Sequence, residues 1–424
     1  MNAVRVVVVD AFERGNRGDA ALLAVLLEQV REVHPGADVR IAGFEDPRRW
    51  PEFDGVPNLG SIRRYAGEEH ASRWARVSRK LLGFLVAALA TVPPGRFALR
   101  LLAPLLPAEV RRELRAVTGA DLVIALGGGY LNARDDLPSD LSVFFLLLPL
   151  WLAQRHGVPV VAAPQSYGPF PRRFQRLLVR AVLSRACEVV VREDISRDRL
   201  LEAGVDEARI SRGVDSGFAF SGSSHRAWRT ELGIPTGIPY VVVTARQWLP
   251  GEAQERYEQA LAAAMRHLLD GGRHVVLAPQ VTCEFQADDD RIVGTRLATA
   301  VAEPGLHVIT HADFDHHDAH ALYAGAEFVL GTRFHSVIFA LTAGVPCLAI
   351  EYDHKTRGIM RDLGLEEWVR RIDEVSGEDL IILLDRLEST LDGYRARLAD
   401  RLPAYVAQAA DTRFLETREP SRAG

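Results

Sequence analysis

Short runs of apolar, mostly β-branched residues alternate along the chain with stretches of helical length. Five such runs lie in each half: residues 6–9, 39–42, 122–126, 158–162 and 188–191, then 240–244, 274–278, 306–309, 328–330 and 347–350. The stretches between them, such as residues 19–33, 172–185 and 252–270, favour helices. Continuously apolar strands separated by helices are typical of parallel sheets covered on both faces. The pattern therefore predicts an α/β protein.

A polar segment rich in Gly, Ser and Pro, residues 221–239, separates the two sets of strands. We therefore expect an N-terminal domain over residues 1–222, a C-terminal domain over residues 223–413 and a disordered tail over residues 414–424. Both domains are predicted to be doubly wound, Rossmann-like folds that face a cleft. Ligands of such sheets bind beyond the carboxyl ends of the strands, so motifs that follow strands are the first candidates for a site.

An apolar segment near residues 81–106 interrupts this alternation and predicts a helical insert in the first domain. Its first apolar run, residues 81–92, is shorter than the roughly 20 residues that a membrane-spanning helix needs. The pattern favours a pair of core helices. The arginines upstream of it leave open a helix that lies at a membrane surface beside anionic headgroups.

Charge and cysteine content narrow the functional classes. A net charge of -5 and a pI near 6.2 argue against a general nucleic-acid binder. The three cysteines form no CxxC pair and suit a reducing compartment. No signal peptide is recognisable before residues 6–9, so we expect a cytoplasmic protein, with contact to the inner face of the membrane left open.

The strongest candidate site is Gly331-Thr332-Arg333-Phe334-His335, between a buried strand and an apolar helix. A strand-to-helix junction offers unpaired backbone N–H groups, which favour anions. Arg333 supplies a planar fork for carboxylate or phosphate, and His335 can donate a proton near neutral pH. Lys355, one of only two lysines in the chain, follows the next strand and is a second candidate anion ligand.

Three motifs follow strands in the first half. In Gly15-Asn16-Arg17-Gly18-Asp19, the carboxylate of Asp19 is either a helix cap or a catalytic or sugar-binding group. Glycines 127–129 lack the spacing of a dinucleotide fingerprint but permit close approach of backbone to a ligand. Gln165 and Ser166 place polar side chains after the fourth strand.

The motifs exclude several other chemistries. His311, His316, His317 and His320 do not have the spacing of a zinc site, so we expect no metal. Neither a G-x-S-x-G nucleophile elbow nor a P-loop occurs.

Taken in order, the motifs resemble those of the polysaccharide pyruvyltransferase family. The resemblance covers most of the chain, through Gly15–Asp19, Gly127–Gly129, Gln165–Phe170, Val191–Ser196, Asp215–Phe218, Gly331–His335 and Tyr352–Lys355. It implies a GT-B-like fold and transfer of the enolpyruvyl group of phosphoenolpyruvate to two hydroxyls of a glycan or lipid-linked sugar. That reaction forms a pyruvate ketal, releases phosphate and uses phosphoenolpyruvate as co-substrate without a further cofactor.

The resemblance also assigns residues. Arg333, Arg246, Lys355 and Phe334 match the donor site, where Phe334 replaces the family's usual Leu. His335 is the candidate acid or phosphate stabiliser, and Asp19, expected across the cleft, is the candidate base. Asn16, Gly128, Gln165 and Ser166 are the candidates for acceptor binding.

Two other functions stay open at this point. A nucleotide-sugar glycosyltransferase would use the same two-domain frame, and a non-catalytic protein could bind sugar phosphates there. A homo-oligomer and peripheral membrane contact are likewise left open.

Overall fold

The computed structural model describes residues 3–67, 78–79, 81–83, 85–86, 104, 106–283 and 288–416. It divides into two compact units. Unit 1 comprises Met1–Glu13, Leu22–Ser216 and Ala410–Gly424, and unit 2 comprises Arg14–Ala21 and Gly217–Ala409. The division falls six residues before the predicted boundary at 222/223. Each unit contains a parallel sheet, as the apolar runs predicted.

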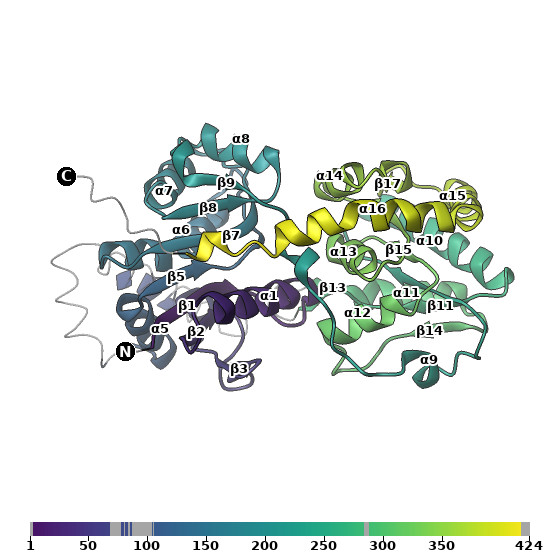
Figure 1. Ribbon diagram of the computed structural model, residues 1–424, viewed down its shortest axis with the longest axis horizontal. Helices are drawn as coiled ribbons and strands as arrows, with labels where there is room; N and C mark the ends of the chain where they lie inside the picture. The colour runs from purple at the N-terminus through teal and green to yellow at the C-terminus, as the bar shows by residue number, and fades with distance from the viewer. Residues whose placement is uncertain are drawn as a thin grey trace. The chain divides into compact units, whose positions relative to one another are not determined.

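The sheet of unit 1 has the strand order β2-β1-β5-β7-β8-β9 (Figure 1). Strand β6 pairs with β7 outside this order. Its strands are β1 (Arg5–Ala11), β2 (Asp38–Gly43), β5 (Leu122–Ala125), β6 (Gly128–Leu131), β7 (Val160–Tyr167), β8 (Glu188–Val191) and β9 (Ile210–Arg212). A short pair, β3 (Glu52–Phe53) and β4 (Val56–Pro57), lies outside it. This is a doubly wound order whose direction reverses between β1 and β5.

Helices cover this sheet. They are α1 (Arg17–Val33), whose first residues belong to unit 2, α2 (Ile62–Gly67), α5 (Ala108–Gly119), α6 (Leu137–Arg155), α7 (Arg173–Leu183) and α8 (Asp194–Glu202), with the 3-10 turns η2 (Glu207–Arg209) and η5 (Arg413–Leu415). Among the described helices, only α6 is long and apolar enough to cross a membrane. Its residues Val143–Leu148 are buried in the core of unit 1, which accounts for its composition without a bilayer.

Two predictions concern segments that the structure describes only in part. Most of the predicted insert near residues 81–106 lies outside the described residues. The predicted tail began at residue 414, but Phe414 and Leu415 are buried in unit 1, so structure continues through residue 416.

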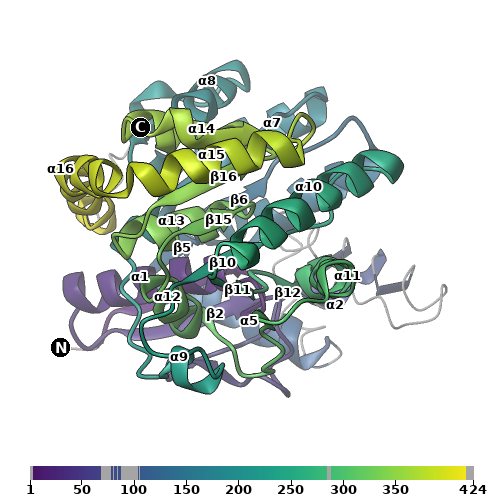
Figure 2. The same cartoon turned by 90° about the vertical axis from the view of Figure 1, so that its right-hand side faces the viewer.

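The sheet of unit 2 has the order β14-β11-β10-β15-β16-β17 (Figures 1 and 2). Its strands are β10 (Tyr240–Thr244), β11 (His274–Leu277), β14 (Leu306–Val308), β15 (Val329–Gly331), β16 (Cys347–Glu351) and β17 (Val369–Arg371), and β12 (Thr282–Cys283) and β13 (Asp288–Asp289) form a separate antiparallel pair. Numbered along the unit, this is the order 3-2-1-4-5-6 of the Rossmann fold. The order reverses between β10 and β15.

Helices lie on both faces of the second sheet. They are α9 (Trp228–Glu231), α10 (Gly251–Asp270), α11 (Asp290–Val301), α12 (His316–Ala324), α13 (Phe334–Thr342), α14 (His354–Asp362), α15 (Gly377–Ser389) and α16 (Leu391–Ala409), with the 3-10 turns η3 (Ser216–Ala219), which begins on the last residue of unit 1, and η4 (Glu366–Trp368). Helix α10 contacts α11 and α15, whereas α13 contacts α12, α14 and α16. The unit is therefore a three-layer α/β sandwich.

Candidate functional site

The point where the strand order of unit 2 reverses brings two predicted donor residues together. Strand β10 pairs with β15, with Thr244 opposite Gly331. Arg246 follows the carboxyl end of β10, and Arg333 follows that of β15. The crevice at such a reversal is the usual ligand site of an open α/β sheet.

Arg333 is held by two aspartates that no sequence motif singled out. It is 5% exposed and precedes α13. Its Nε donates to Asp290 Oδ1 at 3.0 Å, and its Nη1 and Nη2 donate to the two carboxylate oxygens of Asp288 at 2.9 and 2.5 Å. Burial alone would lower the pKa of Arg333, but the two carboxylates outweigh burial and raise it. The guanidinium is therefore permanently charged, and most of its N–H groups are engaged.

The two aspartates differ in exposure. Asp290 is 3% exposed and also accepts hydrogen bonds from the backbone N–H groups of Gln280 and Val281 at 3.0 and 2.8 Å. Asp288, on β13, has a side chain that is 29% exposed. Burial works to raise its pKa, but Arg333 more than compensates and lowers it, so Asp288 is ionised at neutral pH. Asp290 is thus a structural counter-ion, whereas Asp288 is the more exposed partner of Arg333.

Arg246 contacts two aromatic rings that also contact each other, at 4.9 Å between centroids. Its guanidinium carbon is 4.5 Å from the centroid of Trp248 and 4.1 Å from that of Tyr352. Its Nη2 lies 3.5 Å from Asp288 Oδ2, so Asp288 contacts both arginines. The stacking fixes the plane of the guanidinium, and among the described residues its buried Nε has no hydrogen-bond partner.

Hydroxyl groups fix the backbone at the same reversal. Thr244 Oγ1 accepts from the Thr332 N–H at 3.0 Å and shares a hydrogen bond with Ser336 Oγ at 2.9 Å. The Ser336 hydroxyl also donates to the Arg333 carbonyl at 2.6 Å. Tyr257 OH bonds to Thr332 Oγ1 at 2.8 Å. The junction that carries Arg333 is therefore rigid before any ligand binds.

His335 lies on the first turn of α13 and packs against Gly18. A Cβ at position 18 would overlap the imidazole ring, so this close approach requires glycine. Phe334, which is 8% exposed, contacts the His335 ring edge-to-face at 5.2 Å between centroids. The imidazole is therefore held on two sides.

Residues 14–21 belong to unit 2, which corrects their predicted place in the N-terminal domain. Asn16 forms a bridge with Val281, and the Arg17 N–H donates to the Gln280 carbonyl at 3.2 Å. Arg17, 3% exposed, also donates from Nε and Nη2 to the Phe314 carbonyl, and burial lowers its pKa to about 10. Asp19 thus lies in the unit that carries His335 rather than across a cleft from it.

Asn16 and Asp19 interact with each other. Asn16 Nδ2 donates to Asp19 Oδ2 at 2.7 Å, and Asn16 Oδ1 accepts from the backbone N–H groups of Gly18 and Asp19 at 3.2 and 3.3 Å. Asn16 rather than Asp19 therefore caps α1.

Lys355 lies on the first turn of α14, after β16. Its Nζ is 3.3 Å from Asp353 Oδ2. Tyr352, which stacks on Arg246, belongs to the same short segment, so the structure places the Lys355 segment beside the two arginines. The roles of Arg333, Arg246, Lys355, Phe334, His335 and Asp19 stay predictions.

Three of the four predicted acceptor residues, Gly128, Gln165 and Ser166, lie at or beside the end of β7, whereas the fourth, Asn16, lies in unit 2. Gly128 pairs with Gln165 in the sheet, and its φ of 146° suits glycine alone. The Gln165 side chain is 1% exposed, and its Oε1 has no hydrogen-bond partner among the described residues. Ser166 Oγ accepts from Arg192 Nε at 2.8 Å and donates to Glu193 Oε2 at 2.9 Å. Ser166 therefore belongs to a buried polar network.

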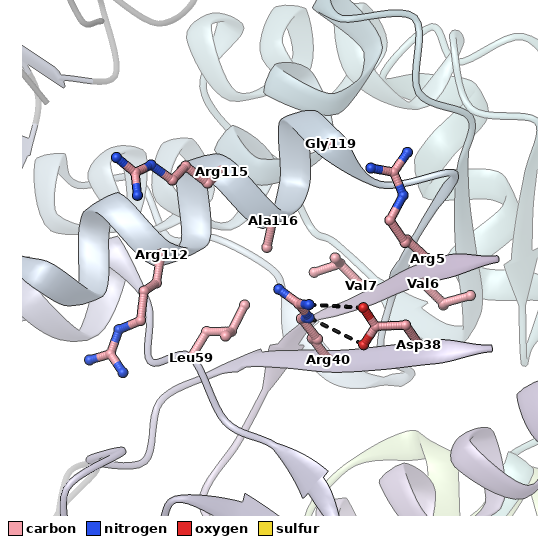
Figure 3. Close-up of a pocket in the computed structure, with 10 residues that line it drawn as sticks. All are labelled: Arg5, Val6, Val7, Asp38, Arg40, Leu59, Arg112, Arg115, Ala116 and Gly119. Carbon is pink, nitrogen blue, oxygen red and sulfur yellow. Dashed lines mark hydrogen bonds and ion pairs between the residues drawn. The ribbon is translucent and has the colours of Figure 1, made fainter. Parts of the chain in front are cut away.

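A hollow of about 420 Å³ lies at the other end of the same sheet, where β1 and β2 begin (Figure 3). Arginines from β1, β2 and α5 line it, and Arg40 pairs with Asp38 inside it. Arg5, at the start of β1, pairs with Asp121. The hollow thus lies at the amino ends of the strands, whereas open α/β sheets bind their ligands at the carboxyl ends, so we assign no chemistry to it.

The histidine cluster near α12 is an aromatic packing motif. The rings of His316, His317 and His320 surround Phe220 at 5.3 to 5.7 Å between centroids. Burial lowers the pKa of His316 to about 3. In the described part of the chain, no three His, Cys, Asp or Glu side chains are arranged to hold a metal ion.

Comparison with known proteins decides the family. The sequence model of the family described as polysaccharide pyruvyl transferase matches residues 16–354. The chain belongs to this family. The match confirms the resemblance inferred from the motifs, and membership in a pyruvyl transferase family makes the chain a transferase. A relative, the amylovoran biosynthesis protein AmsJ of Erwinia amylovora, is 25% identical over 425 residues, with 96% of each chain covered.

Solved structures show the fold of this pyruvyl transferase family member. A UDP-N-acetylglucosamine 2-epimerase superposes with a TM-score of 0.59 at 15% identity, covering 98% of this chain and 95% of that one. The Anabaena protein Alr3699/HepE in complex with UDP-glucose superposes with a TM-score of 0.54 at 14% identity, covering 96% and 95%. At these identities the likeness concerns the fold alone. It confirms the predicted GT-B-like class with two α/β domains.

Proposed function

We propose that this chain transfers the pyruvyl group of phosphoenolpyruvate to two hydroxyls of a glycan or lipid-linked sugar, forming a ketal and releasing phosphate. The observation that carries the proposal is the convergence of Arg246 and Arg333 at the strand reversal of unit 2, in a chain of this family. Phosphoenolpyruvate carries a phosphate and a carboxylate, and fixed guanidinium groups suit both. Lys355, in the neighbouring segment, would add a third cation.

The reaction needs one proton donor and one proton acceptor. Protonation of the methylene carbon of phosphoenolpyruvate makes a methyl group and leaves an oxocarbenium-like centre at the adjacent carbon. The first sugar hydroxyl adds there, the C–O bond to phosphate breaks, and the second hydroxyl closes the ketal. One hydroxyl proton replaces the proton given to the methylene carbon, and the other leaves with phosphate.

His335 is our candidate for the donor and Asp19 for the acceptor of these protons. Both lie in unit 2, and the glycine that precedes Asp19 touches the His335 ring. This proximity supports a shared role, because groups that act on one reacting centre must lie within hydrogen-bond reach of it.

The test should leave Arg333 in place. Its replacement by alanine would strand the buried carboxylate of Asp290, which costs about 3–5 kcal/mol and would confuse loss of function with loss of fold. Arg246→Gln is the better variant, since among the described residues Arg246 contacts one carboxylate, at the longer distance of 3.5 Å.

Arg229→Gln is the matched control for that variant. Arg229 also lies over an aromatic ring, that of Tyr240, but at the amino end of β10. Isothermal titration with phosphoenolpyruvate should give saturable binding in the wild type and in Arg229→Gln, and none in Arg246→Gln. Titration with UDP-glucose is the second arm. Binding of UDP-glucose without binding of phosphoenolpyruvate would replace the proposal with a nucleotide-sugar glycosyltransferase.

A further inference from the structure

Helix α7 of unit 1 exposes apolar side chains on its outer face. Phe174 is 49% exposed and Leu177 is 64% exposed, three residues apart and hence on one side of the helix. The opposite side, with Leu178, Val179 and Val182, is buried in the core of unit 1. The two exposed side chains therefore do not contribute to the core packing that holds α7 in place.

Arginines flank the apolar pair. Residues 171–187 contain five arginines and no acidic residue, in a chain whose net charge is -5; they are Arg172, Arg173, Arg176, Arg180 and Arg185. Arg173 lies beside Phe174, and Arg180 lies one turn after Leu177. Within the described residues, no carboxylate pairs with Arg173 or Arg180. An ordinary solvated helix face carries both signs of charge.

The start of α6 adds a further apolar residue at the same end. Gln175 of α7 donates from Nε2 to Asp140 Oδ1 of α6 at 2.8 Å, and Arg172 pairs with Asp140 at 2.7 Å. Leu137, at the first turn of α6, is 64% exposed. The two helix starts are thus tied together, and each presents an apolar side chain.

We infer that the outer face of α7, with the start of α6, docks against a bilayer surface that contains anionic lipid. Apolar side chains flanked by arginines suit the headgroup boundary, where the rings and aliphatic chains enter the acyl region and the guanidinium groups meet phosphate. The buried side of α7 stays packed on its sheet, so docking needs no unfolding. Helix α7 itself carries only positive charge, which selects anionic over zwitterionic lipid; the start of α6 adds Asp135 and Asp136, of which Asp135 pairs with Arg172.

The position of α7 gives this contact a consequence. The helix follows β7, whose carboxyl end carries Gln165 and Ser166. Docking would hold that edge of the sheet near the headgroups, where a sugar on a lipid carrier is presented. This consequence rests on the proposed function, whereas the docking itself does not.

Flotation of the full-length protein with vesicles tests the docking without reference to activity. We expect binding to vesicles of phosphatidylglycerol and phosphatidylcholine at low salt, and little binding to phosphatidylcholine alone. Leu177→Ser should weaken the partition about tenfold, from the loss of its buried carbons. Its matched control is Ile382→Ser on α15, which is 59% exposed and should bind as the wild type does.

The charge arm uses Arg173→Glu/Arg180→Glu, which should lower partition at least about tenfold. Its control is Arg112→Glu/Arg115→Glu on α5 (Figure 3), an identical change in net charge on a different face. Equal losses in the two double variants would show an effect of net charge alone and overturn the inference. The inference would also be overturned if the wild-type protein did not bind anionic vesicles. It would likewise be overturned if Leu177→Ser bound vesicles as the wild type does and changed only the self-association of the protein.

Discussion

Asp288 should weaken the binding of anions to the arginine pair of unit 2. Its carboxylate contacts Arg333 at 2.5 and 2.9 Å and Arg246 at 3.5 Å. A substrate phosphate or carboxylate that binds these arginines must either displace Asp288 or lie beside its charge. The substitution Asp288→Asn removes the charge and keeps the shape, so we expect tighter binding of phosphoenolpyruvate.

The magnitude follows from the geometry. Two unit charges 4 Å apart interact by about 4 kcal/mol at an effective dielectric constant of about 20. The Asp288 side chain is 29% exposed, so solvent screens part of this repulsion. We expect a gain of about 1–2 kcal/mol, which is about 5- to 30-fold in Kd.

Isothermal titration with phosphoenolpyruvate and with inorganic phosphate measures the effect. Asp289→Asn is the control, because Asp289 belongs to the same strand but pairs with Arg291. It should leave both affinities unchanged. An Asp288→Asn variant that binds these anions as weakly as the wild type, or more weakly, would refute the reasoning and show that Asp288 orients the arginines instead of competing for them.

Three further predictions concern single side chains. Gly18→Ala should lower turnover and melting temperature together, because the added Cβ overlaps His335; steady-state kinetics and thermal melts report both. Asp290→Asn should destabilise unit 2 by about 3 kcal/mol in urea titrations, since Arg333 loses its buried counter-ion. Glu113 is buried on α5, and burial raises its pKa to about 8, so the folded state keeps a proton that the unfolded state releases. The stability of the wild type should therefore fall as the pH rises from about 5 to 8, and Glu113→Gln should not show this fall.

Matched controls accompany these variants. Gly294→Ala lies inside α11 with open space around it and should be neutral or stabilising by about 1 kcal/mol. Asp289→Asn keeps the Arg333 pair intact. For Glu113, the melting temperatures of wild type and Glu113→Gln should converge below pH 5, and parallel pH curves would contradict the assigned pKa.

The sequence predicted the sheets well because parallel strands buried on both faces read as unbroken apolar runs. Arg246 and Arg333 could be found for the same reason, since each directly follows such a run. The aspartates that pair with them could not be found from the sequence. Asp288 and Asp290 lie more than 40 residues from Arg333, in and after a strand pair of two residues each, and an aspartate before a helix is also what an ordinary cap looks like.

The placement of residues 14–21 shows a second limit. The motif follows β1 in the chain, so order alone assigned it to the first domain. Its place in unit 2 depends on the bridge between Asn16 and Val281 and on the bonds from Arg17 to the Phe314 carbonyl, both made across more than 250 residues. No local periodicity encodes such contacts. The close packing of Gly18 on His335 is equally long-range.

This placement bears on how the site works as a unit. Within unit 2, the carbonyls of Gln280 and Phe314 accept from Arg17, so the segment that carries Asp19 is bonded to the turns beside Asp290. Asp290 in turn fixes Arg333, and Arg333 precedes the helix that carries His335. The candidate base, the donor arginine and the candidate acid are therefore linked through a single set of hydrogen bonds. Loss of the Arg333–Asp290 contact should therefore disturb the donor arginine most and the other two groups less, because Asp288 and Ser336 also hold Arg333 and Phe334 also packs on His335.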